Sequence, residues 1–250
     1  MNKKHLIFEK TTFALKIGKI AHMKNILSLF ALLLFINSYS QDGISPKEVI
    51  SQYIEAIGGK DKLESIESIK MSGNFEIPQA PFKPSVVIKQ QNPNLTSLEM
   101  SAPEIGTIMK QKFNGNDGYM EQMGQNVPFS EDQINSSKSK KGIFEELYYD
   151  STVLKIDGYV TIGASDLVKV KIDDKTLKYY DVNTGLLERS EETMEVEGSS
   201  ITTTRKFSDY KDVDGILYPF KTEIINGMQT ITIEFDEIKF NEVFDENDFN

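Results

Sequence analysis

The chain has 250 residues, with 28 Lys and Arg against 38 Asp and Glu, and it contains no cysteine. Without cysteine it can form neither a disulfide nor a thiolate metal site, so burial of apolar side chains must stabilise the fold unaided. The net charge of −10 makes nucleic acid an unfavourable partner.

The N-terminal region has the pattern of a secretory signal. Lys24 precedes the apolar run at 26–36 (ILSLFALLLFI), and the small and polar residues 37–40 follow it. The run is about eleven residues long, short of the roughly 20 that a membrane-crossing helix needs. We therefore expect a signal core at 23–40 that is cleaved near Ser40. Residues 1–22 are either an extension of this signal or lie ahead of the native start.

Cleavage would leave residues 41–250 as a single exported domain that is not an integral membrane protein. Both histidines, His5 and His22, precede the cleavage point, so the mature chain would lack imidazole as well as thiol groups. We therefore expect no catalytic residues, no cofactor and no metal site. Removing six Lys and one Glu leaves 22 basic and 37 acidic residues, a net charge of −15.

The first predicted element of the mature chain is a helix with caps at both ends. Ser45 is its N-cap, Pro46 follows at the first helical position, and Glu48 completes a capping box. Gly58 and Gly59 end the helix. A short helical turn is predicted at 60–64. The buried stripe of the first helix is predicted to contain Val49, Ile50, Tyr53, Ile54 and Ile57.

After residue 68 the apolar period changes from that of a helix to that of a strand. Alternating apolar and polar residues, separated by Asn-Gly, Asp-Gly and similar turns, predict consecutive antiparallel hairpins. A sheet of about eleven such strands must curl strongly or close. The predicted strands are 69–77, 85–91, 96–101, 106–113, 118–122, 153–162, 167–172, 177–182, 186–197, 199–210, 217–225 and 228–240.

One segment, 130–147, interrupts this series. It begins with the possible N-cap Ser130 and ends with Ile143, Phe144 and Leu147 at helical spacing, which predicts one or two short helices. Its middle is rich in Ser and Lys and poorly amphipathic.

Two local patterns have the composition of a site, and we interpret both as structural. In the sequence 209–215 (DYKDVDG), Gly215 at the sixth position of a calcium loop would put Lys221 at the twelfth, where a Glu is required. The glutamates of 186–197 would divide between two faces of a regular strand, with Glu188 and Glu192 on one and Glu191, Glu195 and Glu197 on the other. We therefore expect a hairpin turn and a charged surface.

A group of methionine and phenylalanine residues is a candidate for an apolar pocket. Met109, Met120 and Met123 lie near Phe113 and Phe129 in the sequence. This group is either ordinary core or part of an adaptable apolar pocket, since the unbranched Met side chain fits varied ligand shapes.

Five segments resemble one family, the LolA/LolB-like outer-membrane lipoprotein-sorting proteins, especially those of Bacteroidetes. These segments are 57–59 (IGG), 144–149 (FEELYY), 177–187 (LKYYDVNTGLL), 209–221 (DYKDVDGILYPFK) and 240–249 (FNEVFDENDF). The resemblance implies a mostly β fold, in which a curved antiparallel sheet of about 11 strands forms an incomplete β-barrel with a few helices over its concave face.

The resemblance also implies a function. It indicates a periplasmic carrier that binds a lipid or a lipoprotein acyl chain in a hydrophobic cavity. It names no pocket residue in this sequence, so the ligand-binding residues stay undefined. The alternative is a structural module of the cell envelope, without catalysis, that docks a protein partner. An empty apolar cavity would favour the carrier, and a filled interior would favour the docking module.

Overall fold

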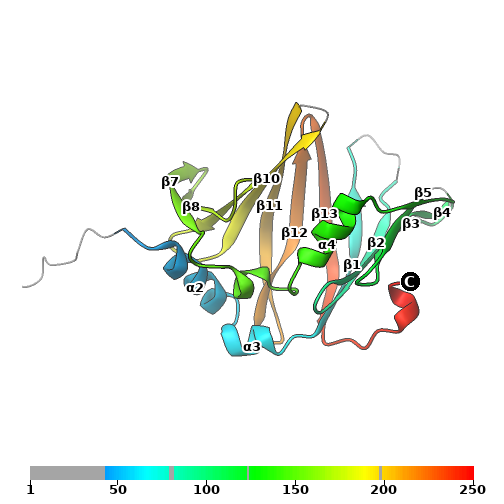
Figure 1. Ribbon diagram of the computed structural model, residues 1–250, viewed down its shortest axis with the longest axis horizontal. Helices are drawn as coiled ribbons and strands as arrows, with labels where there is room; N and C mark the ends of the chain where they lie inside the picture. Colours follow the sequence, from blue (N-terminus) through cyan, green and yellow to red (C-terminus); the bar gives the residue numbers. More distant parts are fainter. Residues whose placement is uncertain (1–42, 79–81, 123, 197–198) are drawn as a thin grey trace, which may run out of the picture. The chain divides into compact units, whose positions relative to one another are not determined.

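The computed structural model describes residues 43–78, 82–122, 124–196 and 199–250 (Figure 1). The predicted signal, both histidines and Met123 lie outside the described residues. Within that part of the chain, no helix is both long and apolar enough to cross a membrane.

The first described helix, α2 (Pro46–Ala56), confirms the predicted caps. The hydroxyl of Ser45 accepts a hydrogen bond from the backbone N–H of Glu48, and the Glu48 carboxylate accepts one from the N–H of Ser45 at 2.8 Å. The short helix α3 (Lys60–Glu64) follows. Of the predicted stripe, Val49, Ile50, Tyr53 and Ile57 are buried and Ile54 is half-buried.

One antiparallel sheet of 13 strands contains nearly all the rest of the described chain. Its strands are β1 (Ser68–Glu76), β2 (Ser85–Gln91), β3 (Leu95–Ala102), β4 (Gly106–Phe113), β5 (Gly118–Gln122), β6 (Gln125–Pro128), β7 (Lys155–Ile162), β8 (Ser165–Lys171), β9 (Thr176–Asp181), β10 (Leu187–Val196), β11 (Ser199–Val213), β12 (Ile216–Asn226) and β13 (Gln229–Phe240).

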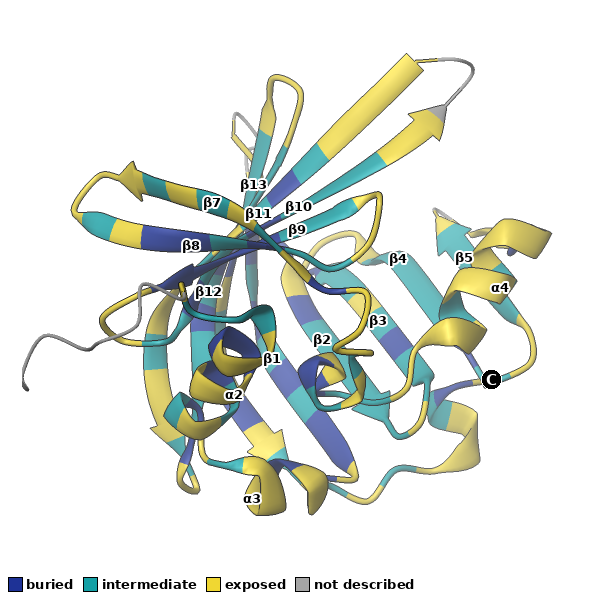
Figure 2. Ribbon diagram, turned by 60° about the vertical axis from the view of Figure 1, so that its left-hand side comes forward, coloured by how far each residue is buried: buried dark blue, intermediate teal, exposed yellow. Residues whose placement is uncertain are grey.

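Strands that follow one another in the chain are neighbours in the sheet, except that β6 and β7 do not pair. The strand order runs β6-β5-β4-β3-β2-β1-β13-β12-β11-β10-β9-β8-β7, so the first and last strands pair in the middle and β6 and β7 form the two edges. The sheet is therefore an open, curved half-barrel, as predicted (Figure 2). The strand that the sequence did not predict is β6, whose four residues are all exposed and therefore lack an alternating pattern.

The segment between the two edge strands contains the predicted helices. α4 (Glu131–Ser139) has a capping box between Ser130 and Gln133, and the 3₁₀-helix η1 (Glu145–Tyr148) follows it. Both lie on the same side of the sheet as α2, which we call the inner face (Figures 1 and 2).

The largest core cluster fills the part of the inner face that α2 covers. Side chains of α2 and α3 pack there against β8, β9, β10 and β12, and Phe144 joins them from the segment before η1. The buried members of this cluster are Val49, Ile50, Tyr53, Ile57, Leu63, Ile66, Phe144, Leu154, Val168, Val170, Tyr180, Leu187 and Ile216.

A bulge in β13 fixes the register at the centre of the sheet. The register shifts between Ser72 and Gly73, where β1 faces β13. A β-carbon at position 73 would overlap the backbone of Glu234 and Phe235, so only glycine fits this close approach.

The end of the chain packs on the outer face of the sheet. Beside the 3₁₀-helix η2 (Glu246–Asp248), Lys112 donates hydrogen bonds to the carbonyl oxygens of Asn247 and Asn250, and Lys89 pairs with Asp248. The C-terminal segment therefore covers part of the outer face of β2 and β4.

Candidate functional site

The segment 142–149 positions the charged groups of the site. Asn92, just after β2, anchors it because its side chain accepts a hydrogen bond from the N–H of Ile143 at 3.1 Å and donates one to the carbonyl of Ile66 at 2.8 Å. Ile143 and Phe144 then pack against the core, and η1 turns Glu145 and Glu146 toward β9.

A buried ion cluster joins this segment to the sheet. The Nζ atom of Lys178, on β9, lies 2.6 Å from Oε1 of Glu146 and 2.5 Å from Oε1 of Glu145. It also lies 5.3 Å from the centre of the Tyr149 ring, a cation–π distance. The side chains of Lys178 and Glu146 are 7% and 6% exposed, whereas that of Glu145 is 58% exposed. The cluster therefore extends from the core to the solvent.

Lys178 and Glu145 keep their charges because their partners outweigh the cost of burial. Burial alone would lower the pKa of Lys178, but Glu146 and Glu145 raise it above its ordinary value. Burial alone would raise the pKa of Glu145, and Lys178 reverses this and lowers it. Lys178 is therefore charged at neutral pH, as a paired buried amine should be.

Tyrosines surround the ion cluster. The rings of Tyr53 and Tyr180 lie 5.4 Å apart, and the hydroxyl of Tyr210 donates to the carbonyl of Leu187 at 2.6 Å. The hydroxyl of Tyr180 is fully buried and has no hydrogen-bond partner among the described residues. Burial raises the pKa of Tyr53, Tyr180 and Tyr210, and it raises the pKa of Tyr218 to about 12, so all four are neutral phenols at pH 7.

A cavity of about 270 Å³ opens beside the cluster. Its aromatic walls are Tyr53, Phe144, Phe207, Tyr210 and Tyr218. The combination of phenol rings with charged groups differs from the purely apolar cavity that the resemblance implied. Such a lining suits a ligand group that is polar and bulky rather than a hydrocarbon chain.

An apolar surface continues from this cavity along the inner face. On β2, Val86, Ile88 and Gln90 share one side by alternation, and Gln90 lines the cavity. Half-buried apolar side chains of β2 and the neighbouring strands form this row, namely Ile88, Leu98, Met100, Ile224, Ile231 and Phe235.

Helix α4 stands on this side of the sheet and leaves the apolar surface incompletely covered (Figures 1 and 2). It buries none of its own residues, and its one aliphatic residue, Ile134, is only half-buried. The reason lies in its composition, since EDQINSSKS has no apolar stripe.

The methionines noted in the sequence belong to this surface in part. Met109 and Met120 lie on the inner face beside Met100 and are half-buried, whereas Phe113 is fully buried with its ring stacked on that of Phe129 at 6.3 Å. The group therefore divides into a packed end with the two phenylalanines and a more open end with the methionines.

The glutamates of β10 form separate ion pairs and hydrogen bonds. Glu191 accepts from the Tyr179 hydroxyl and pairs with Arg189, and Glu192 pairs with Arg205. A register shift beside Glu188 breaks the regular alternation assumed from the sequence. Among the described residues, no three Asp, Glu, His or Cys side chains are grouped to hold a metal ion.

The sequence analysis did not single out Lys178, Glu145 or Glu146. The sequence did contain one signal of a buried charge. Lys178 and Tyr180 are two residues apart on a predicted strand, so their side chains share one face, on which both are buried. A charged residue there requires a buried partner, and the acids of FEELYY, flanked by aromatic residues, are the partners that the fold supplies.

The fold matches that of LolA-like proteins. Compared with a LolA superfamily protein from Nitrosomonas europaea, the TM-score is 0.55 at 10% identity over 83% of this chain and 98% of that one. A DUF1329 family protein from Desulfovibrio piger gives 0.56 at 10% identity, with 83% and 98% covered. An outer membrane lipoprotein-sorting protein domain from Vibrio parahaemolyticus gives 0.52 at 12% identity, with 80% and 94% covered.

These structural matches show a shared fold, the half-barrel of LolA-like proteins. They extend over nearly the full length of each matched protein. No family model and no curated protein matches the sequence.

Proposed function

We propose that this protein is an exported carrier that binds a lipid or acyl chain on the inner face of its half-barrel. Residues 23–40 would direct export, and the mature chain would begin at Gln41. The observation that carries the proposal is the half-buried apolar row of β2, β3 and β13, which faces a helix that buries none of its own residues.

The apolar row is incompletely buried. Its half-exposed Ile, Leu, Met and Phe side chains keep part of their apolar area in water, and burying that area is favourable by roughly 25 cal/mol per Å². A hydrocarbon chain laid along the row would remove that area from water without displacing a packed side chain of α4. Met100 and Met109 would let the row adapt to chains of different shape. The LolA-like fold adds support, because one structural neighbour is named for lipoprotein sorting.

The first test is native mass spectrometry of the chain secreted by its own signal and purified without detergent. We expect a protein mass that begins at Gln41, together with a co-purifying lipid or acylated peptide that solvent extraction releases. A bare mass that also resists added lipid would refute the carrier. A mass that retains residues 23–40 would refute the signal assignment alone.

Matched substitutions locate the binding surface. Ile88→Gln and Leu98→Gln place amides within the apolar row, and each should weaken lipid binding about tenfold or more. Val87→Gln is the control, because Val87 is also half-buried but points to the opposite face of β2. Equal weakening by all three variants would show that the inner face is not the site.

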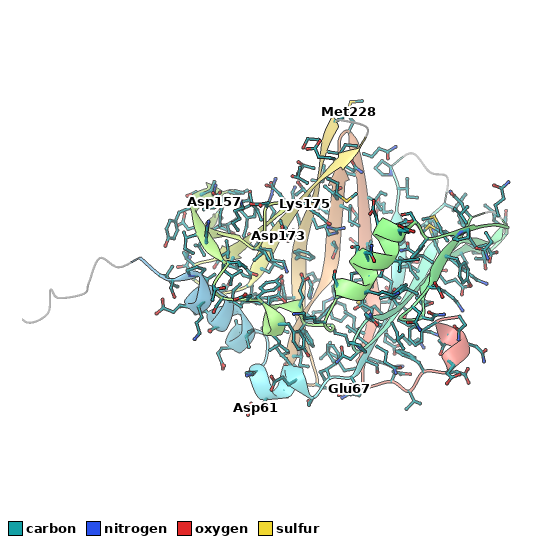
Figure 3. All side chains as sticks on the ribbon, viewed as in Figure 1. Asp61, Glu67, Asp157, Asp173, Lys175 and Met228 are labelled. Carbon is teal, nitrogen blue, oxygen red and sulfur yellow. The ribbon has the colours of Figure 1, made fainter. Side chains whose placement is uncertain are left out.

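Docking of a protein partner is the second candidate function, and exposed apolar side chains at the hairpin tips favour it. Met194 and Ile201 pair across β10 and β11 and are 53% and 39% exposed, and Met228 is fully exposed at the tip between β12 and β13 (Figure 3). If lipid binding fails, substitution of these three by Ser should abolish association with envelope proteins captured by chemical crosslinking.

A further inference from the structure

We propose that the cavity beside Glu146 is a head-group subsite for a zwitterionic lipid, with the ammonium group of the ligand against Glu146 and its anionic group near Lys140. This inference rests on the proposed function and deepens it, because it names the class of lipid. The order of apolar, basic and acidic side chains along the inner face supports it.

Four charged side chains line the cavity. Two are acidic, Glu145 and Glu146, and two are basic, Lys140 and Lys178. Lys178 lies deep and is fully engaged with the glutamates, whereas Lys140, the C-cap residue of α4, is exposed. A ligand therefore meets the exposed cation of Lys140 and the partly exposed carboxylate of Glu145 near the surface, and the buried carboxylate of Glu146 further in.

The glutamates can accept further hydrogen bonds. Lys178 bonds Oε1 of each carboxylate, and each keeps a second oxygen, Oε2, that Lys178 does not use. Glu146 is buried and borders a cavity walled by aromatic rings. Carboxylate and aromatic faces together are the surroundings that stabilise an organic ammonium ion.

The order of apolar, basic and acidic side chains along the inner face matches the order of chemical groups in one class of lipid. Starting on β2, the apolar Val86 and Ile88 lead to Gln90, which borders the cavity together with Lys140. Glu146 lies beyond them, on the η1 side. An acyl chain, an anionic linker and a terminal ammonium follow one another in the same order in a zwitterionic phospholipid. An anionic or uncharged head group would place no cation against the carboxylate oxygens that Lys178 leaves free.

The test uses three lipids with one acyl chain and different heads, each below its micelle concentration. They are lysophosphatidylethanolamine, lysophosphatidylglycerol and a monoacylglycerol, measured by calorimetry on the mature chain. We expect the ethanolamine lipid to bind about tenfold more tightly than either of the others. Equal binding of all three would overturn the head-group subsite and leave the carrier intact. No binding of any would refute the carrier itself.

Two variants assign the contacts. Glu146→Gln should remove the preference for the ethanolamine lipid over the phosphatidylglycerol lipid, because only the ethanolamine lipid has an ammonium group. Lys140→Gln should weaken both phosphate-bearing lipids by the same factor, because each places its phosphate near Lys140. Neither variant should change the monoacylglycerol affinity. Lys140 is exposed, so its variant should fold even if the Glu146 variant does not. Lys141→Gln is the control, because Lys141 is adjacent but does not line the cavity. If Lys140→Gln leaves the affinity for both phosphate-bearing lipids unchanged, or if Lys141→Gln weakens them equally, the assigned subsite is wrong.

The apolar row supplies the final check. Ile88→Gln should weaken all three lipids by the same factor, because each places the same chain on β2. If Ile88→Gln weakens binding of the ethanolamine lipid alone, the three lipids do not place the same chain on β2. The proposal that one ligand occupies both the cavity and the apolar row would then be wrong.

Discussion

At the scale of single residues, Lys178 is the most constrained side chain of the site. Its amine is buried and meets two carboxylates and a tyrosine ring. The pair with Glu146 is costly to desolvate, so its presence is weak evidence for stability and better evidence for a defined geometry. Removing one partner is different, because it leaves a buried charge without compensation.

We therefore predict that Lys178→Met lowers the free energy of unfolding by about 3–5 kcal/mol. Lys169→Met is the matched control on the adjacent strand, since Lys169 pairs with Asp157 where the two side chains are 26% and 46% exposed. The control should lose less than about 1 kcal/mol. Urea denaturation of both variants measures the difference, and similar losses would contradict the burial argument.

The lowered pKa of Glu145 predicts a contribution to acid stability. Burial acts to raise this pKa, but Lys178 outweighs burial, so the folded value lies below the unfolded one. The stabilisation is therefore present above the unfolded pKa of about 4.3 and is lost as pH falls through the folded value. Glu145→Gln should flatten the decrease in melting temperature below about pH 5.

At the scale of elements, α2 and α4 separate the effect of capping from that of packing. Both begin with a complete capping box, and both have a serine N-cap. α2 buries Val49, Ile50 and Tyr53, whereas α4 buries none of its residues. Because helices of this length gain most of their stability from packing, the two should differ strongly in local stability.

We predict that backbone amides of α4 exchange with solvent at least a hundredfold faster than those of α2. Hydrogen exchange followed by mass spectrometry resolves the two segments. Ser130→Ala should speed exchange of α4 with little change in global stability, whereas Ser45→Ala should cost about 1 kcal/mol of the whole fold. Equal protection of the two helices would contradict the argument that packing, and not capping, determines their local stability.

Most elements were predictable because each has a local signal. The capping box at Ser45 and the N-cap residue Ser130 indicated where two helices begin, and the Asp214-Gly215 turn, with both φ angles positive, joins β11 to β12 as expected. β6 gave no signal because it has no buried side. The site could not be predicted because Lys178 and Glu146 meet through tertiary packing across 32 residues of sequence.

At the scale of the whole molecule, five tyrosines link the cavity to global stability. Tyr53, Tyr149, Tyr180, Tyr210 and Tyr218 come from α2, the end of η1, β9, β11 and β12. Burial raises the pKa of each. A raised tyrosine pKa contributes stability that is present below the unfolded pKa of about 10 and is lost as pH rises toward the folded value.

We predict that these five tyrosines ionise only as the sheet unfolds. Between about pH 10 and pH 12, the rise in tyrosinate absorbance from the buried group should coincide with loss of the far-ultraviolet circular dichroism of the sheet. The chain has no Trp, so the tyrosine signal is not obscured. Full ionisation with an intact sheet spectrum would show that the cavity admits hydroxide without unfolding.

The pairing of β1 with β13 has a consequence for how the protein is made. β1 is synthesised early, but β13, which pairs with its second edge, is the last strand of the sheet to be synthesised. During translation, and again during any passage across a membrane as an unfolded thread, that edge has unpaired amides and carbonyls that attract other chains. Accompaniment by a chaperone until synthesis reaches Phe240 would protect the nascent half-sheet from aggregation.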